Sequence, residues 1–202
     1  MIKKLTIPVD HGNRNMKTTH FLFTTGLSST DRKPAGREDF LQTEGKYYVL
    51  SGKRIPYQRD KTQDERFSIL TRFAIAKELE RTGQVAEEDV VQVSLPIGVP
   101  PKHYAELADR YREYFLGDGK VQELVYNGRT YHTCIRDVAV YPQAYAAMMT
   151  EGEKIRQIPK AVGIDIGGFT SDFLLMRSGA PCLDYCDSME KGVITMYNDI
   201  IS

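Results

Sequence analysis

The most informative stretch of this sequence is Val162-Gly163-Ile164-Asp165-Ile166-Gly167-Gly168-Phe169-Thr170-Ser171-Asp172. Apolar runs before Asp165 and from Phe173 to Met176 predict two strands, and the glycine pair between them predicts a tight turn. A strand that ends in aspartate can present a carboxylate to Mg²⁺, directly or through water. Gly167 and Gly168 let backbone amides approach a phosphate with no Cβ in the way, and Thr170 adds a short donor. The stretch therefore predicts a phosphate-binding hairpin.

The same pattern occurs near the start of the chain, in Ile7-Pro8-Val9-Asp10-His11-Gly12-Asn13-Arg14-Asn15-Met16-Lys17. Each copy has an apolar strand, Asp-x-Gly, a small polar turn and a charged residue seven positions after the aspartate. A lone Asp-x-Gly is typical of an ordinary β-turn, but the two copies together favour phosphate binding. Asp10 and Gly12 repeat the carboxylate and the glycine, Asn13 and Asn15 add donors, and Lys17 supplies a compact cation. A repeat at this separation suggests two related half-structures that face each other across a shared site.

These residue types fit phosphoryl transfer. Asp165 and Asp172 would help to position a metal ion and the attacking water, and Asp10 and Asp165 are the candidate Mg²⁺ ligands. The competing nucleotide motifs, GxxxxGK[ST] and a GxGxxG that follows a strand, are absent from the sequence.

The rest of the chain alternates between predicted strands and helices, which argues for an α/β architecture. Further strands are predicted at residues 5–9, 18–25, 46–50, 90–95 (stopped by Pro96), 121–126, 129–135 and 138–141. Helices are predicted from about residue 64 to Gly83, at 103–116, at 143–152 and at 192–201. The turn chemistry of Asn127-Gly128 predicts a hairpin, and the polar residues 26–45 predict an irregular or exposed insertion.

Composition sets limits on partners and compartment. Lysine plus arginine and aspartate plus glutamate both number 27, so the balance gives no reason to expect direct nucleic-acid binding. No stretch has the apolar length of a signal peptide or of a spanning helix. Cys134, Cys182 and Cys186 lack paired CxxC spacing, which favours reduced thiols in a cytoplasmic protein over a metal site.

The two motifs resemble those of the actin-like ATPase superfamily, which also contains sugar kinases and heat-shock chaperones. The resemblance is greatest to bacterial and plasmid actins of the ParM/StbA type. Residues 138–144, with Pro142-Gln143, resemble the segment that connects the motifs in that family. Residues 93–100 resemble its Gly-Leu-Pro strand end, with Ser94 where glycine is common. The resemblance implies that Gln143 orients the attacking water, and because a neutral amide is a poor base it implies slow, assembly-dependent hydrolysis.

The resemblance implies a ribonuclease H-like (actin-like ATPase) fold, α/β, with a mixed sheet and flanking helices. Residues 1–155 would form one complete lobe with an insertion at about 26–85, and 156–202 the beginning of a second lobe. Beyond Ser202 a family member would continue with the rest of that lobe and a glycine-rich adenosine motif, so the chain alone is expected to bind nucleotide weakly. His11 and Arg14 replace acidic, serine or threonine residues often seen in the first turn, and their roles stay open.

The function implied is a cytoplasmic ATPase that binds ATP (or GTP) and Mg²⁺, forms filaments and segregates plasmid DNA. Filament contacts would come from residues 26–65 and exposed helix faces, and an adaptor protein would link the filament to DNA. Neither membrane nor direct nucleic-acid binding is expected. Two alternatives stay open: a non-polymerising superfamily kinase, such as a sugar or acetate kinase, and a scaffold module without turnover.

Overall fold

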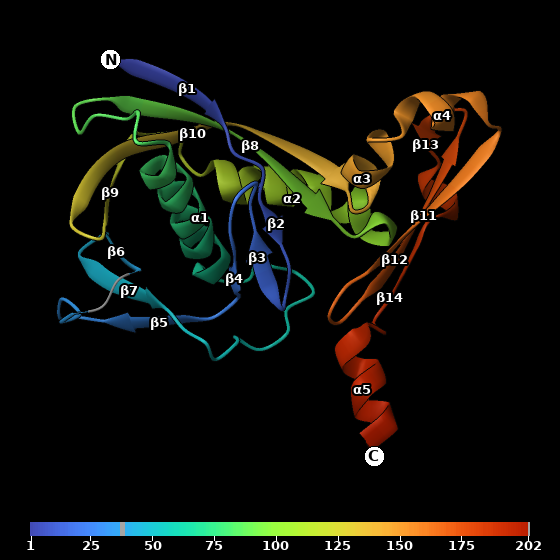
Figure 1. The fold of residues 1–202 in the computed structure, drawn as a ribbon, viewed down its shortest axis with the longest axis horizontal. Coiled ribbons are helices and arrows are strands. Elements are labelled where there is room, and N and C mark those ends of the chain that lie inside the picture. The colour runs from blue at the N-terminus through green and yellow to red at the C-terminus, as the bar shows by residue number, and fades with distance from the viewer. Residues whose placement is uncertain (37–38, 202) are drawn as a thin grey trace. The chain divides into compact units, whose positions relative to one another are not determined.

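The structure, a computed structural model, describes residues 1–36 and 39–201 (Figure 1). Its elements, in chain order, are β1 (Ile2–Thr6), β2 (Asp10–His11), β3 (Asn15–Lys17), β4 (Leu22–Thr24), β5 (Leu27–Thr30), β6 (Phe40–Thr43), β7 (Lys46–Leu50), α1 (Arg66–Thr82), β8 (Val90–Val99), η1 (Pro101–His103), α2 (Tyr104–Leu116), β9 (Gln122–Tyr126), β10 (Arg129–Pro142), α3 (Tyr145–Met149), α4 (Gly152–Gln157), β11 (Lys160–Ile166), β12 (Ser171–Arg177), β13 (Ala180–Pro181), η2 (Leu183–Tyr185), β14 (Asp187–Met189) and α5 (Val193–Ile201).

Three sheets organise these strands. The largest has seven strands in the order β1-β8-β10-β9-β6-β7-β5. It is mixed, because β1 pairs with β8 in parallel whereas β9, β6, β7 and β5 pair antiparallel. The strands β2, β3 and β4 form a small sheet of their own, and β11, β12, β13 and β14 form the third. The predicted α/β class with a mixed sheet and flanking helices is confirmed.

The chain divides into two compact units, residues 1–97 with 111–139 and residues 98–110 with 140–202. The first has a large core that includes fully buried side chains of α1 and β8, among them Phe67, Leu70 and Val93. The second has a smaller core of Ile155, Leu174 and Met176, packed against residues of α3 and of the η2 region. The two predicted lobes, residues 1–155 and 156–202, stay a prediction, because the compact units describe which residues pack together and do not test the lobe boundaries.

Local sequence signals correctly predicted several elements. Helix α1 ends at Gly83, which adopts φ 60° and donates its N–H to the carbonyl of Glu80. A left-handed residue at this position is the usual helix stop, and glycine takes it without a Cβ penalty. Asn127 and Gly128 both have positive φ, 51° and 87°, as the two-residue turn between β9 and β10 requires. In the first unit, α1 contacts β9 and β3.

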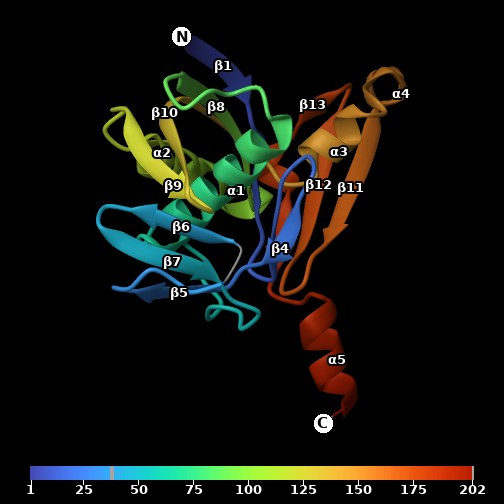
Figure 2. The same cartoon turned by 60° about the vertical axis from the view of Figure 1, so that its left-hand side comes forward.

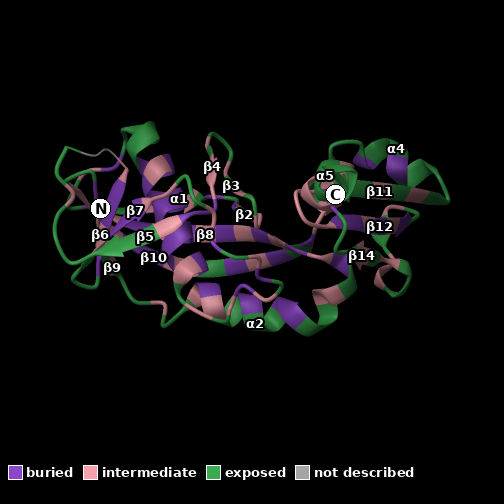
Figure 3. Ribbon diagram, turned by 90° about the horizontal axis from the view of Figure 1, so that it is seen from below, coloured by how far each residue is buried: buried purple, intermediate pink, exposed green. Residues whose placement is uncertain are grey.

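Two predictions about strands were wrong. Residues 26–45 were predicted to be irregular or exposed, and the irregular alternative is wrong, because they contain β5 and β6. Strand β5 ends the sheet order and its last three side chains are exposed, so its polar composition concealed it. Strand β8 does not stop at Pro96 but continues to Val99, with alternating burial along its length (Figure 3). Pro96 has no N–H to donate, but its carbonyl still accepts a hydrogen bond from Val9 N–H at 3.0 Å.

Two further predicted elements are shorter than expected. Of residues 18–25 only Leu22–Thr24 is strand, because the preceding residues turn back at the tip of the β3–β4 hairpin. The helix predicted at 143–152 begins only at Tyr145, since Ala144 has φ 68°, a left-handed conformation that cannot continue a right-handed helix. A second short helix, α4, begins at Gly152.

Candidate functional site

Both sequence motifs form antiparallel hairpins with the same register. In the first hairpin Asp10 on β2 lies opposite Lys17 on β3. In the second, formed by β11 and β12 (Figure 2), Asp165 lies opposite Asp172. In each case the aspartate faces the residue seven positions later. The repeat in the sequence is therefore also a repeat of backbone structure.

The charged groups of the first hairpin are accessible to solvent. Lys17 Nζ donates a hydrogen bond to Asp10 Oδ2 at 3.0 Å, and the two side chains are 57% and 41% exposed. Because water reaches both groups, a phosphate could reach the ammonium and a cation could reach the carboxylate.

The turn of the first hairpin is narrow. A Cβ on Gly12 would lie 2.4 Å from the carbonyl oxygen of Asn15, so only glycine fits there. Thr25 holds the turn from outside: its hydroxyl donates to the Gly12 carbonyl at 2.6 Å and its N–H donates to the Arg14 carbonyl at 3.0 Å. The Arg14 side chain is exposed, and its role stays open.

The two asparagines of the turn differ in their surroundings. Asn13 Nδ2 donates to the carbonyl of Gln58, and the N–H of Gln58 donates to Asn13 Oδ1, both at 2.9 Å. Asn15 is half-buried on β3, opposite Thr24 of β4. One of the two amide hydrogens of Asn13 is therefore committed to the protein, a feature that no local sequence pattern indicated.

His11 is a core residue. Its ring is fully buried, stacks on Phe115 at 4.4 Å and places Nε2 2.7 Å from the hydroxyl oxygen of Thr71. That hydroxyl donates to the carbonyl of Phe67, so it accepts from His11, and Nε2 carries the proton. Burial, with a smaller effect of Lys61, lowers the pKa of His11 well below 6.5. His11 is thus neutral and structural, and does not contact a phosphate.

Two hydrogen bonds within the second hairpin stabilise its turn. Gly167 N–H donates to the carbonyl of Thr170 at 2.8 Å, and the Thr170 hydroxyl donates to Asp172 Oδ2 at 3.2 Å. Asp172 is only 2% exposed, whereas Asp165 across the hairpin is exposed. Burial leaves Asp172 suited to orienting groups in the turn, and exposure leaves Asp165 able to reach a ligand.

Helix α5 begins against this turn. Val193 N–H donates to the Gly167 carbonyl at 3.0 Å and Ile194 N–H to the Gly168 carbonyl at 2.9 Å. A Cβ on Gly192 would lie 2.5–2.6 Å from backbone atoms of residues 167–169. The close approach makes Gly192 a structural part of the hairpin, a role that the sequence analysis did not assign.

Gln143 follows strand β10 and belongs to the same compact unit as the second hairpin. Its backbone N–H donates to the Val99 carbonyl at 2.8 Å, and its side-chain Oε1 is buried without a hydrogen-bond partner in residues 1–36 and 39–201. Nearby, a Cβ added to Gly163 of β11 would lie 2.5 Å from Met148 Sδ of α3, and 3.5 Å from the Cβ of Ala144, the residue after Gln143. A glycine inside a strand often marks such an approach, so Gly163 could have indicated this packing from sequence.

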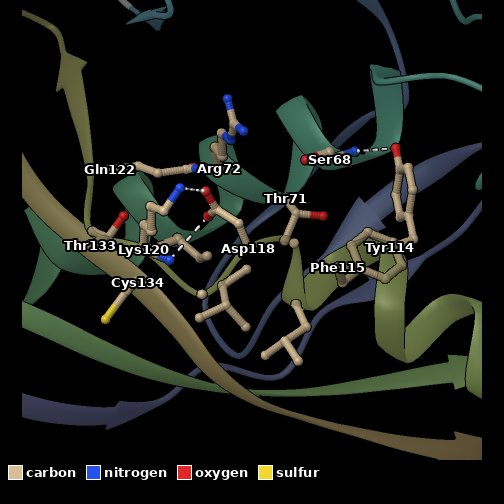
Figure 4. Close-up of a pocket in the computed structure, with 15 residues that line it drawn as sticks. Ser68, Thr71, Arg72, Tyr114, Phe115, Asp118, Lys120, Gln122, Thr133 and Cys134 are labelled. Carbon is tan, nitrogen blue, oxygen red and sulfur yellow. Dashed lines mark hydrogen bonds and ion pairs between the residues drawn. The ribbon is translucent and has the colours of Figure 1, made fainter.

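A cavity of about 50 Å³ lies elsewhere, between α1 and residues 114–135 (Figure 4). Its lining includes Thr71, Arg72, Lys120 and Cys134 and none of the sequence-predicted site residues. Its volume would hold a water molecule or two but not a nucleotide.

The described part of the chain has no group of three or more His, Cys, Asp or Glu side chains placed to hold a metal ion. Mg²⁺ at a nucleotide is usually held by one or two carboxylates, with phosphates and water as the other ligands. The absence of such a group from the described residues leaves Asp10 and Asp165 as predicted Mg²⁺ ligands. No helix among the described residues is long and apolar enough to cross a membrane.

Comparison with known proteins identifies the family and the fold of the chain. The family model described as "Actin like proteins N terminal domain" matches residues 8–145. No curated protein sequence gives a significant match.

Solved structures with the same fold include several actin-like proteins. Apo ParM of pSK41 has a TM-score of 0.75 and 14% identity, over 98% of this chain and 70% of that one. An AlfA filament bound to AMPPNP has a TM-score of 0.68 and 16% identity, over 95% and 71% of the two chains. Ta0583, an archaeal actin homolog, has a TM-score of 0.70 and 18% identity, over 93% and 62%. At these identities the structural likeness shows the fold alone.

The family model matches more than half of the chain and includes the first hairpin, whereas the second hairpin lies beyond the matched residues. The chain belongs to the actin-like protein family.

Proposed function

We propose that this protein binds ATP or GTP with Mg²⁺ through its two hairpins, hydrolyses it slowly, and forms filaments that segregate plasmid DNA through an adaptor protein. The observation that carries the proposal is the common register of the hairpins, which sets Asp10 opposite Lys17 and Asp165 opposite Asp172. Nucleotide is also bound by proteins of this fold: the AlfA filament is bound to AMPPNP, and Ta0583 forms a complex with ADP.

Each hairpin would contribute different groups. In the first, Lys17 would neutralise phosphate charge, and the glycine turn would bring backbone amides close to phosphate oxygens. Asn15 would add a donor, and Asn13 could add its second amide hydrogen. In the second, Gly167 and Gly168 would cradle phosphate, and the Thr170 hydroxyl would have to rotate away from Asp172 to donate to it.

The hydrolytic step would depend on placing a water molecule. Gln143 Oε1 lacks a partner in the described residues and can accept a hydrogen bond from water. A neutral amide orients water but takes up its proton poorly, which supports slow turnover. When bound, Mg²⁺ would neutralise charge on the phosphate oxygens, and Asp10 and Asp165 would hold it directly or through water.

Isothermal titration calorimetry with Mg-ATP tests the nucleotide assignment. Asp165→Asn removes the exposed carboxylate of the second hairpin and should weaken binding by at least about tenfold. Asp184→Asn is the matched control, because Asp184 is an exposed aspartate of the same compact unit outside the motif, and it should bind like the unaltered chain. Absence of binding by the unaltered chain, or equal binding by Asp165→Asn, would contradict the assignment.

Filament formation needs its own measurement. Light scattering and pelleting should detect a polymer that depends on ATP and Mg²⁺ and is lost in Asp165→Asn. Three related actin-like structures are filaments, two of AlfA and one of Alp12. No nucleotide-dependent polymer at any salt concentration would argue against it, and phosphate transfer to a small-molecule acceptor faster than hydrolysis would favour a superfamily kinase.

A further inference from the structure

The side chain of Asn13 forms a two-bond bridge to the backbone of a residue 45 positions away. Its amide nitrogen donates to the Gln58 carbonyl, and its amide oxygen accepts from the Gln58 N–H, each at 2.9 Å. A side-chain amide can serve both bonds because it is donor and acceptor at once. A carboxylate in its place could accept but would face the Gln58 carbonyl without a proton to donate.

Residues 55–64, here called the clamp segment, are fixed along their length. A second link joins the clamp segment to residues 12–14, here called the first phosphate turn. It runs through Thr25, whose carbonyl accepts from the Ile55 N–H and whose hydroxyl donates to the Gly12 carbonyl. The anchoring hydrogen bonds of the clamp segment to neighbouring elements are Ile55 N–H to Thr25 O (2.9 Å), Lys61 N–H to Tyr111 Oη (3.1 Å) and Tyr114 Oη–H to Asp64 O (2.6 Å).

Gln58 is held by its own side chain as well. It is 8% exposed, and its Nε2 donates to Asp64 Oδ2 at 2.8 Å. Asp64 also pairs with Arg66 at 2.6 Å, and the hydrogen bonds from this guanidinium hold the pKa of Asp64 well below its usual range. The backbone that receives Asn13 is therefore a rigid support.

We propose that Asn13 is a positioning residue, and that its amide sets the first phosphate turn against the clamp segment. The inference rests on the proposed nucleotide function, because it concerns the same turn. The bridge fixes the turn before phosphate arrives, so less conformational freedom is lost on binding. Phosphate at the turn and order in the clamp segment then favour each other, since coupling between two sites is reciprocal.

Amide hydrogen exchange of the nucleotide-free chain, resolved at Gln58, tests the bridge. Asn13→Ala should raise the exchange rate of the Gln58 N–H by about tenfold or more, because its acceptor is lost. Asn13→Asp keeps an acceptor and should retain most of the protection. Asn15→Ala is the matched control: it removes the other asparagine of the turn, whose side chain has no hydrogen bond to the clamp segment among the described residues, and should leave Gln58 unchanged.

Calorimetry with Mg-ATP on the same variants tests positioning. Asn13→Ala should bind about tenfold more weakly, and Mg-ATP should protect the clamp segment in the unaltered chain but not in this variant. A loss of affinity with unchanged Gln58 exchange would overturn the proposal, since it would indicate direct phosphate contact. Equal Gln58 exchange in Asn13→Ala and Asn15→Ala would overturn it too.

The unaltered chain separates failure of the bridge from failure of the proposed function. If it binds no Mg-ATP, the nucleotide function fails and the positioning role fails with it. The exchange comparison still reports whether Asn13 holds the turn. Should Asn13→Ala not fold, Asn13→Asp still tests the bridge by exchange alone: a protected Gln58 N–H supports it, and an unprotected Gln58 N–H in a folded variant overturns it.

Discussion

The first hairpin combines two kinds of residue within a few positions. Asp10 and Lys17 keep their charged groups in solvent, while His11, directly after Asp10, is fully buried against Phe115. Adjacent residues of a strand point to opposite faces, so one face of the hairpin can serve a ligand while the other completes the core. The alternation of side chains along one strand thus separates the residues that solvent reaches from those that stabilise the core.

The burial of His11 predicts a pH dependence of stability. Its folded-state pKa is lowered, so the unfolded chain binds the proton more tightly. The contribution of neutral His11 is therefore fully present above 6.5 and is lost as the pH falls below 6.5 toward the folded-state pKa. Between about pH 7.5 and about pH 5.5 the unaltered chain should lose ~1.4 kcal/mol more unfolding free energy than His11→Gln.

Urea denaturation at the two pH values measures this difference. The unaltered chain and His11→Gln share every other titratable group, so the difference between their pH slopes isolates His11. An identical pH slope in His11→Gln and the unaltered chain would show that His11 does not titrate as the burial requires.

At the scale of elements, the start of α5 packs directly on the turn of the second hairpin. The first amides of the helix donate to the carbonyls of Gly167 and Gly168, and Gly192 brings the two backbones together. The first N–H groups of a helix have no acceptor within it, and here the turn supplies two. The helix in turn fixes the carbonyl side of the turn.

Gly192→Ala should therefore disturb the second turn. Its new Cβ would meet backbone atoms at 2.5–2.6 Å, which cannot rotate away. The expected cost is about 1–3 kcal/mol of unfolding free energy, with NMR shift changes at residues 167–170. In the control, Gly152→Ala, the Cβ would meet the terminal methyl of Met149, a flexible group that can move. Unchanged shifts at 167–170 in Gly192→Ala would contradict the tight packing.

At the scale of the whole chain, the two compact units have separate cores. Leu70 of α1 and Leu174 of β12 are both fully buried, one in each unit. Leu70→Ala and Leu174→Ala should each lower the stability of their own unit by about 2–5 kcal/mol. Hydrogen exchange in increasing urea should show loss of protection first in the unit that carries the substitution. Equal loss in both units for either variant would mean that the chain unfolds as one cooperative body.

Much of the fold could be predicted because its signals are local. Asn127-Gly128 encodes its turn through positive φ, and Gly83 stops α1 for the same reason. The two Asp-x-Gly motifs predicted hairpins, and in the structure each motif forms a hairpin with the same register as the other. Turns and helix ends depend on residues only a few positions apart, so a short stretch of sequence contains all the information needed to predict them.

Elements whose partners are distant in sequence could be recognised only in the folded chain. Strand β5 is polar and pairs with β7, and β8 continues past Pro96, whose carbonyl accepts from Val9 N–H. The environment of His11 comes from Thr71, and the bond of Asn13 comes from Gln58. Local sequence patterns encode which residues form turns, which end helices and which alternate in burial along strands. Folding determined which polar groups meet, because hydrogen bonds and burial between segments 45 or 60 positions apart leave no local pattern.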